Sequence, residues 1–267
     1  MLTTAYFKRW GLTPDGEPII TRSSSLLPVR QSGVPAMLKI ALSEEERRGG
    51  VLMSLWNGEG AARVLAKDGD AILLERAEDG RSLTELVRSG KDDEASCIIC
   101  SIVAKLHAVK NRPFGGLIPL SQWFRELEPA VARHGGILLK SAAAARDLLS
   151  TPRDVVALHG DIHHDNILDF GERGWLAIDP KGLLGERGFD YANIFCNPHE
   201  IATAPGRLSR QASMVSEASG LERTRLLQWV LAYAGLSAAW FVNHGEGAEL
   251  PLAVAEAAAA ELVSCGH

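Results

Sequence analysis

Residues 159–166 read HGDIHHDN, and this polar block decides how the rest of the chain is interpreted. The segments 155–158 and 175–178 on either side of it are apolar, so each is expected to form a short buried strand. The polar block therefore lies on a loop that is held between two buried anchors.

Three oxygen-bearing side chains in and after this block form a candidate catalytic set. Asn166 comes five residues after Asp161, and Asp179 comes thirteen residues after Asn166. One carboxylate can accept the proton of a hydroxyl group, while an amide oxygen and a second carboxylate are hard ligands of the kind that Mg²⁺ prefers. Phosphoryl transfer depends mainly on positioning and charge neutralisation, which such a set can provide. A plain turn rich in Asp and Asn is the alternative, and the second acid beyond the block disfavours it.

Two metal-binding interpretations are also disfavoured. His159, His163 and His164 could form a zinc site, but no cysteine or fourth ligand lies near them in the sequence. Cys97 and Cys100 form a C-x-x-C pair inside a helical apolar pattern, so packing in the core is favoured over redox or metal chemistry.

The first 77 residues predict a small sheet with one helix. Strands are expected at 18–22, 26–30, 35–41, 61–66 and 71–76. Ser43 can cap a helix with an acidic first turn, which is expected to continue to Trp56 and end at Asn57. Lys39 lies in the middle of a strand just before this acidic turn, a setting that favours a functional ammonium group over an ordinary surface lysine.

After Ala77 the hydrophobic pattern becomes helical. Helices are expected at 93–109, 123–133 and 142–149, and in two or more segments from residue 222 onward. The chain therefore predicts an α+β fold with two lobes, a sheet-rich lobe at residues 1–77 and a larger, mainly helical lobe at 78–267. The boundary is expected near 75–80.

The composition excludes several classes of protein. The chain has 267 residues, of which 46% are hydrophobic and 23% charged, which excludes a disordered chain, a collagen and a coiled coil. A net charge of −5 without a basic stripe argues against nucleic-acid binding. The segment 226–242 is apolar but only 17 residues long, so it predicts a core helix and no membrane association. With no secretory signal and only four cysteines, a cytoplasmic protein is expected.

The larger lobe carries most of the negative charge. Residues 1–77 contain 10 basic and 9 acidic residues, whereas residues 78–267 contain 18 basic and 24 acidic residues. An acidic lobe suits a cationic ligand, although solubility alone would also account for it.

The motifs carry a resemblance to a known family. HGDIHHDN matches the H-x-D-x-x-x-x-N register of a kinase catalytic loop, with Gly160 where protein kinases have arginine. The form HGD-x-H-x-x-N resembles the aminoglycoside phosphotransferase family. Five further stretches resemble its streptomycin 6-kinase and hydroxyurea phosphotransferase branch: LPVR at 27–30, LK at 38–39, NGEGAAR at 57–63, GWLAIDP at 174–180 and LSAAW at 236–240. The resemblance covers nearly the whole chain and implies a protein-kinase-like fold, in which a small antiparallel sheet lobe with one helix precedes a helical C-terminal lobe.

The resemblance also implies roles for the residues of the catalytic set. Asp161 is expected to act as the base, or to orient the acceptor hydroxyl. Asn166 and Asp179 are expected to bind Mg²⁺. Asp190 is expected to be a buried acid that braces the catalytic loop.

Nucleotide binding is assigned to the smaller lobe by the same resemblance. Lys39 is expected to contact the phosphates of ATP, and Glu46 is expected to hold Lys39, with Glu45 as the alternative. Backbone groups of the linker between Glu75 and Ala77 are expected to receive adenine.

Ser24 is the remaining nucleotide-binding residue that the resemblance implies. It lies in the run 23–25, where protein kinases place a glycine-rich loop, but the G-x-G-x-x-G pattern is absent. Cradling of the phosphates by the backbone is therefore less secure here than in a protein kinase.

The implied activity is the ATP- and Mg²⁺-dependent transfer of a phosphoryl group to an aminoglycoside, at the 6-hydroxyl of streptomycin, with antibiotic resistance as the result. Only ten residues separate Asp179 from Asp190, which leaves no room for a phosphorylated activation loop and favours a small cationic acceptor. A kinase of another acceptor such as hydroxyurea, and a nucleotide-binding pseudokinase, remain open. A monomer or a weak dimer is expected.

Streptomycin carries two guanidinium groups, which fit the acidic character of the larger lobe. The acidic residues considered as contacts are Glu200, Glu217, Glu246 and Glu249, among which the sequence does not choose. Trp240 is expected in the core, with a place in the acceptor pocket as the alternative.

Overall fold

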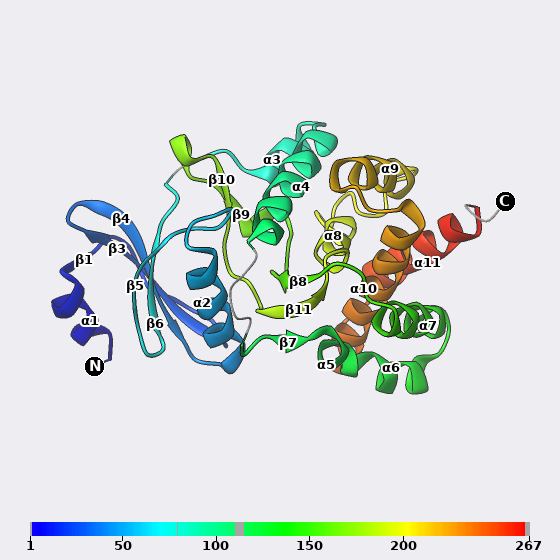
Figure 1. The fold of residues 1–267 in the computed structure, drawn as a ribbon, viewed down its shortest axis with the longest axis horizontal. Coiled ribbons are helices and arrows are strands. Elements are labelled where there is room, and N and C mark those ends of the chain that lie inside the picture. The colour runs from blue at the N-terminus through cyan, green and yellow to red at the C-terminus, as the bar shows by residue number, and fades with distance from the viewer. Residues whose placement is uncertain (1, 79, 110–114, 265–267) are drawn as a thin grey trace.

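The computed structural model describes residues 2–78, 80–109 and 115–264 of the chain. Figure 1 shows a sheet-rich lobe at the N-terminal end and a larger, mainly helical lobe that contains the C-terminus. The α+β architecture with two lobes is therefore confirmed. The chain leaves the first sheet at Glu75 and enters the next helix at Leu83, while the division into residues 1–77 and 78–267 stays a prediction.

The N-terminal lobe is built on a six-stranded antiparallel sheet. Its strands are β1 (Leu12–Pro14), β2 (Ile19–Ile20), β3 (Ser24–Gln31), β4 (Val34–Ala41), β5 (Val64–Asp68) and β6 (Ala71–Glu75). They lie in the order β1-β3-β4-β6-β5, with β2 paired to β3. The β3–β4 hairpin turns at Ser32 and Gly33, which both have positive φ, as a tight two-residue turn requires. In the resulting register Lys39 lies opposite Leu26 and Ile72.

Helix α2 (Glu44–Trp56) follows β4 and has the ends expected from the sequence. The hydroxyl of Ser43 accepts a hydrogen bond from the backbone N–H of Glu46 at 3.3 Å, and Asn57 ends the helix in the left-handed conformation. The Glu46 side chain does not return to Ser43 but is used elsewhere in the lobe, as described below.

A second helix in this lobe was not expected. Helix α1 (Leu2–Trp10) packs Tyr6, Phe7 and Trp10 against a small core formed by the sheet. Arg9 forms an ion pair with Asp68 at the end of β5. Nine residues with only a few apolar side chains give too short a periodic pattern for a helix to be inferred, and the contact with the sheet stabilises it.

The C-terminal lobe is a bundle of helices around one large hydrophobic core. These helices are α3 (Leu83–Arg88), α4 (Asp92–Ala108), α5 (Leu120–Trp123), α6 (Leu127–His134), α7 (Ile137–Ser150), α8 (Phe189–Ala192), α9 (Arg207–Ser219), α10 (Arg223–Asn243) and α11 (Glu249–Ser264). Of these, α3, α8 and α9 were not expected.

The long apolar helix α10 lies at the centre of this lobe, between α7 and α11 (Figure 1). Its length and mean hydropathy would allow it to cross a membrane, but 67% of the apolar window is buried inside the protein. Trp229 and Tyr233 on this helix are buried, as expected for a core helix.

The helix expected at 123–133 is divided into α5, a 3₁₀ turn at Phe124–Glu126, and α6. Pro129 accounts for the break. Proline has no backbone N–H and is tolerated only in the first turn of a helix, and Pro129 is the third residue of α6. Trp123, the last residue of α5, and Glu126, in the 3₁₀ turn, both line a pocket that is described below.

Two small sheets hold the polar block in place. They are formed by β7 (Ile118–Pro119), β8 (Val155–Leu158) and β11 (Leu183–Glu186), and by the hairpin of β9 (Ile167–Asp169) and β10 (Trp175–Ala177). The strands expected on both sides of the block are thus confirmed, and residues 159–166 connect β8 to β9.

The two lobes touch where α2 meets the segment after Asp179. A Cβ added to Gly49 would lie 2.2 Å from the carbonyl oxygen of Pro180, and one added to Gly182 would lie 3.0 Å from the Cβ of Arg48. Glycine at position 49 is therefore required for this approach, and α2 sits directly on the segment 180–182.

Candidate active site

The buried carboxylate of Asp190 supports the catalytic loop, residues 159–166. Its oxygens accept hydrogen bonds from the backbone N–H groups of His159 at 2.9 Å and Gly160 at 2.8 Å. The Nε2 atom of His107 lies 2.8 Å from the same carboxylate. Gly160 has φ +86°, and a Cβ there would lie 2.8 Å from the side chain of Leu183, so the sharp turn before Asp161 requires glycine.

His159 ties the catalytic loop to the strand that leads to Asp179. Its Nε2 atom lies 2.8 Å from the carbonyl oxygen of Ile178, and its Nδ1 atom accepts the backbone N–H of Asp161 at 3.2 Å. Burial lowers the pKa of this imidazole below its ordinary value. The ring is therefore neutral, with its proton on Nε2, and it has a structural role.

The metal-binding alternatives are not supported within the described parts of the chain, where no group of three or more His, Cys, Asp and Glu residues could hold a metal ion. The Nδ1 atom of His163 is already used as an acceptor for the N–H of Asp165. Cys100 is buried in the core as expected, but Cys97 is exposed, with its sulfur 3.5 Å from that of Met214.

Both oxygens of the Asp161 carboxylate are contacted by neighbouring side chains, and the carboxylate is still accessible to solvent. Its Oδ1 atom accepts a hydrogen bond from the amide of Asn193 at 3.1 Å, and its Oδ2 atom lies 3.5 Å from the ammonium group of Lys181. The side chain is 28% exposed. The carboxylate of Asp161 is thus held in one orientation, while its role as the base stays a prediction, and Asn193 is an orienting residue that the sequence did not reveal.

Asn166 and Asp179 line the same cleft and fit a magnesium site. The amide nitrogen of Asn166 donates to the carbonyl oxygen of Asp161 at 2.9 Å, which leaves its Oδ1 atom without a partner among the described residues. Burial opposes the charge of Asp179, but the ammonium groups of Lys39 and Lys181 outweigh it and lower the pKa of this carboxyl. Two protein oxygens suit Mg²⁺, which usually completes its shell with water and phosphate oxygens.

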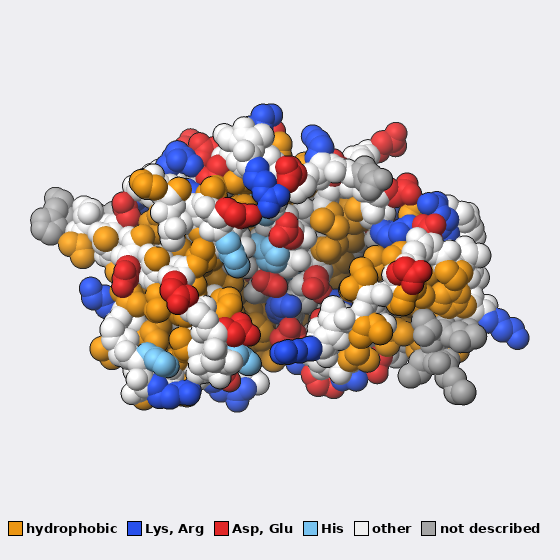
Figure 2. Space-filling view, turned by 180° about the vertical axis from the view of Figure 1, so that it is seen from behind, with side chains coloured by type: hydrophobic (Ala, Val, Ile, Leu, Met, Phe, Trp, Pro, Cys, Tyr) orange, Lys and Arg blue, Asp and Glu red, His pale blue; other side chains and the backbone are white. Residues whose placement is uncertain are grey.

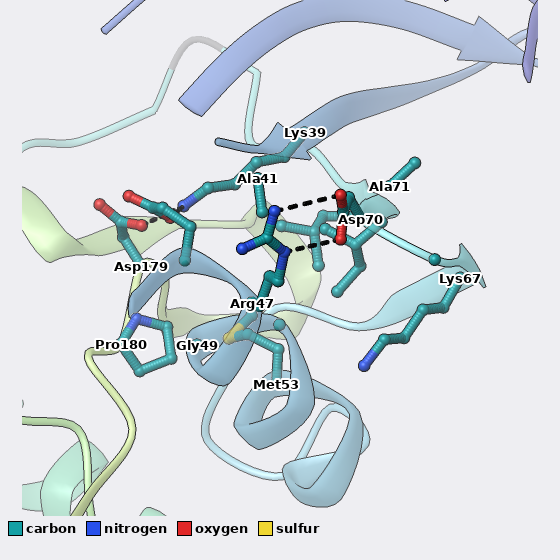
Figure 3. A pocket seen from close by; sticks show the side chains of 15 residues that line it. Lys39, Ala41, Arg47, Gly49, Met53, Lys67, Asp70, Ala71, Asp179 and Pro180 are labelled. Atoms are coloured by element: carbon teal, nitrogen blue, oxygen red, sulfur yellow. Dashed lines mark hydrogen bonds and ion pairs between the residues drawn. The ribbon is translucent and has the colours of Figure 1, made fainter. Parts of the chain in front are cut away.

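Lys39 extends from β4 toward Asp179, as Figure 3 shows. Its ammonium group forms ion pairs with Asp179 and with the buried carboxylate of Glu46. Glu46 also accepts a hydrogen bond from the hydroxyl of Ser23 at 2.8 Å. The structure thus pairs Lys39 with Glu46, as expected, and not with Glu45.

A cleft of about 410 Å³ lies between the lobes above these residues. All the residues expected to bind the nucleotide or Mg²⁺ line it, namely Ser24, Lys39, Glu46, Glu75, Ala77, Asn166 and Asp179. Figure 2 views the molecule from the side opposite to that of Figure 1, and it shows acidic, basic and histidine side chains gathered in a hollow at the middle of this face.

The loop that replaces a glycine-rich loop is closed on itself. The hydroxyl of Thr21 accepts the backbone N–H groups of Ser23 at 3.2 Å and Ser24 at 2.9 Å. The hydroxyl of the buried Ser24 lies 3.1 Å from the same Thr21 oxygen. These N–H groups are therefore occupied and do not form a phosphate cradle in this conformation, while a contact of Ser24 with the nucleotide stays a prediction.

The linker between Glu75 and Ala77 offers a free backbone donor to a base. The backbone N–H of Glu75 donates to the carbonyl oxygen of Arg63 at 3.0 Å, and its carboxylate is bound by Arg63 and Arg173. The N–H of Ala77 has no partner among the described residues. Adenine recognition by this linker stays a prediction, with Ala77 as its donor.

A second pocket of about 460 Å³ adjoins the cleft at Lys181, whose ammonium group lies 3.5 Å from the carboxylate of Asp161. It is lined by Glu45, Ile118, Gln122, Trp123, Arg125, Glu126, Lys181, Trp240 and His244. The rings of Trp123 and Trp240 meet edge to face, with centroids 5.6 Å apart. Trp240 thus lines this pocket, which is the alternative considered from the sequence.

The acidic residues of this pocket differ from those considered from the sequence. Glu200, Glu217, Glu246 and Glu249 are not among its lining residues, and Glu200 instead binds Arg88 at 2.8 Å. Glu45 and Glu126 provide the carboxylates. Trp123 and Glu126 are three residues apart, a spacing that places two side chains on one face of a helix, and this was the signal available in the sequence.

Comparison with known proteins agrees with this geometry. Residues 9–245 match the model of a family described as aminoglycoside/hydroxyurea antibiotic resistance kinase. A streptomycin 3″-kinase from Klebsiella pneumoniae is 50% identical over 89% of this chain and 91% of its own length. A streptomycin 6-kinase from Streptomyces griseus is 31% identical over 94% of this chain and 86% of its own length.

The fold is also similar to that of solved structures. A thermostable mutant of aminoglycoside phosphotransferase APH(4)-Ia, in a ternary complex with ADP and hygromycin B, superposes with a TM-score of 0.59 at 12% identity. The match covers 98% of this chain and 96% of that one. The expected protein-kinase-like fold and the ATP- and Mg²⁺-dependent phosphotransferase class are confirmed, and the pseudokinase alternative is set aside. This chain belongs to the aminoglycoside/hydroxyurea antibiotic resistance kinase family.

Proposed function

We propose that this protein transfers the γ-phosphoryl group of ATP to the 3″-hydroxyl of streptomycin and so confers resistance to the antibiotic. The supporting observation is the 50% identity to a streptomycin 3″-kinase over 89% of the chain, compared with 31% to a streptomycin 6-kinase. The 3″-position therefore takes the place of the 6-position that the sequence motifs suggested.

The catalytic loop supports the transfer through Asp161. Its carboxylate accepts the proton of the acceptor hydroxyl, or orients that hydroxyl, as the oxygen bonds to the γ-phosphorus atom. The bond from that phosphorus to the β-phosphate oxygen breaks, and the electron pair leaves with ADP. Asn193 and Lys181, which hold the two carboxylate oxygens, keep Asp161 in one orientation during this step.

The nucleotide is held from both lobes. Lys39, positioned by Glu46, contacts the phosphates, and the backbone N–H of Ala77 donates a hydrogen bond to the base. Asn166 and Asp179 would hold Mg²⁺, which when bound supplies neutralisation of the phosphate charge. The ion pair between Lys39 and Asp179 is exchanged for contacts with these ligands when the nucleotide binds.

The pocket beside Asp161 supports a cationic acceptor. Glu126 and Glu45 can pair with guanidinium groups, and the faces of Trp123 and Trp240 can stack on them. The excess of acidic residues in 78–267 attracts such a molecule from a distance. We place the reaction in the cytoplasm, where ATP is available, and a monomer or a weak dimer stays the expectation.

The test is to incubate the purified protein with ATP, Mg²⁺ and streptomycin and to locate the new phosphate by phosphorus–proton correlation NMR. A phosphate on the 3″-oxygen supports the proposal. A phosphate on the 6-oxygen overturns the position but keeps the drug as substrate. Turnover of hydroxyurea or another alcohol, with none of streptomycin, overturns the substrate.

A further inference from the structure

Lys181 lies at the junction of the nucleotide cleft and the acceptor pocket. Within the described part of the chain it is the one residue that lines both. Any group that passes from a bound nucleotide to an acceptor in the second pocket has to move past this side chain.

The ammonium group of Lys181 is held between the two lobes. It lies 3.3 Å from the Oε1 atom of Glu45 on α2 and 3.5 Å from the Oδ2 atom of Asp161 on the catalytic loop. Lys181 is therefore a fixed positive charge beside the base.

The backbone that carries Lys181 is fixed as well. Its N–H donates to the carbonyl oxygen of His159 at 2.7 Å, which links it to the catalytic loop. Pro180 before it is packed against Gly49, and Gly182 after it is packed against Arg48. The backbone at Lys181 is thus fixed next to the loop that carries Asp161.

The other cations of the nucleotide cleft have different partners. Lys39 pairs with Glu46 and Asp179, on the side of β4. Arg76 pairs with Asp15. Lys181 is the cation of this cleft whose ammonium group lies next to Asp161, where the phosphorus atom and the acceptor oxygen meet.

We propose that Lys181 is a catalytic residue whose ammonium group donates a hydrogen bond to a non-bridging oxygen of the phosphoryl group during its transfer. The proposal rests on the kinase reaction described above. The bond from phosphorus to the β-phosphate oxygen breaks, the bond to the acceptor oxygen forms, and the hydroxyl proton goes to Asp161. Lys181 keeps its own protons throughout and stabilises the charge that the phosphoryl oxygens carry in the transition state.

The test compares Lys181→Met, which keeps the length of the side chain but removes its charge, with Lys181→Arg, which keeps the charge. Removal of one donor that acts in the transition state typically lowers kcat by about 100-fold or more. We expect this loss of kcat for Lys181→Met, with the Kd for ATP and the melting temperature nearly unchanged, and partial recovery of kcat in Lys181→Arg. A kcat for folded Lys181→Met within about threefold of wild type overturns the proposal.

A second readout separates this proposal from the identity of the acceptor. In the absence of any acceptor, water takes the place of the hydroxyl, and the slow hydrolysis of ATP should also fall in Lys181→Met. Unchanged hydrolysis overturns a role for Lys181 in phosphoryl transfer, whereas failure of the wild type to phosphorylate streptomycin refutes only the proposed substrate. If Lys181→Met does not fold, Lys181→Gln is measured in the same way, with the same outcomes.

Discussion

The Oδ1 atom of Asp190 accepts the backbone N–H of Gly160 at 2.8 Å, although the two residues are 30 positions apart in the chain. Asp190 therefore fixes the turn that presents Asp161, without touching the reacting groups. The neighbouring bond from the N–H of His159 to Oδ2 means that both oxygens of the buried carboxylate act as acceptors for the loop.

Asp190→Asn is expected to loosen this turn. The amide keeps the shape of the side chain but replaces one acceptor with a donor, which leaves a buried loop N–H unpaired at a cost of about 1–3 kcal/mol. We expect the melting temperature to fall by several degrees and kcat to fall at least about tenfold. Calorimetry and steady-state kinetics measure this, with the exposed Glu172→Gln as control, and a variant as active and stable as that control would contradict the bracing role.

Asp161→Asn is expected to remove the group that accepts or orients the hydroxyl proton. The amide can still be held by neighbouring side chains, so the protein should fold and bind ATP normally. Coupled ADP release with streptomycin should fall by at least about 100-fold. Asp165→Asn, an exposed acid on the same loop, is the matched control, and near-normal turnover of Asp161→Asn would exclude the assigned role.

Glu46→Gln and Glu45→Gln form a pair that tests how the nucleotide lysine is held. Loss of the buried Glu46 carboxylate leaves Lys39 with Asp179 alone, so we expect the Kd for ATP to rise about tenfold, equivalent to about 1.4 kcal/mol. Glu45→Gln should change this Kd much less because Glu45 binds Lys181. Titration calorimetry distinguishes the two, and equal effects on ATP binding would show that the pairing is incorrect.

Glu126→Gln is expected to weaken acceptor binding without affecting the nucleotide. The KM for streptomycin should rise several-fold, because an ion pair between a carboxylate and a guanidinium group becomes a hydrogen bond to a neutral amide. In the wild type the same KM should rise with ionic strength, since salt screens the attraction between charges. The exposed Glu217→Gln in α9 is the control, and a KM that responds to neither change would move the acceptor away from this pocket.

His164 predicts how stability depends on pH. Its ring is 2% exposed, and neither nitrogen has a hydrogen-bond partner among the described residues. Burial, assisted by the guanidinium group of Arg207, lowers the pKa of His164 to about 4. The unfolded chain binds this proton below about pH 6.5, whereas the folded protein binds it only below about pH 4.

The free energy of unfolding is therefore expected to be highest above pH 6.5 and to fall as the pH is lowered toward 4, by on the order of 3 kcal/mol from this residue. Urea unfolding at pH 7 and pH 4.5 measures the change. His164→Asn should reduce the dependence but not abolish it, because the pKa of His159 is lowered in the same direction. The exposed His199→Asn should leave it intact, and an equal slope in both variants would contradict the prediction.

The local parts of the site were predictable from sequence because they depend on neighbouring residues. The block 159–166 with its two flanking strands, the cap at Ser43 and the end of α2 at Asn57 all follow from spacing and turn chemistry. The pairing of Lys39 with Glu46 was implied by the family resemblance, since Glu46 lies one turn into the helix that follows the strand of Lys39.

The remaining features depend on contacts between distant segments. Lys181 is unremarkable in the sequence, and its role emerges only when α2 is placed on the segment 180–182. The acidic residues of the acceptor pocket were misjudged because Glu45 and Glu126 belong to elements that are far apart in the sequence and meet at this pocket only in the folded chain. Helix α1 was not predicted because its packing on the sheet stabilises it more than its own hydrophobic pattern does.

The neighbouring glutamates of α2 serve different substrates, because successive residues on a helix project about 100° apart. Glu46 reaches the lysine on the nucleotide side, while Glu45 reaches the lysine on the acceptor side. Because α2 packs against Pro180, a shift of this helix would displace both carboxylates together. Binding of the nucleotide is thus expected to change the affinity for the acceptor, and binding of the acceptor to change the affinity for the nucleotide by the same factor. Helix α2 would then couple the two binding equilibria.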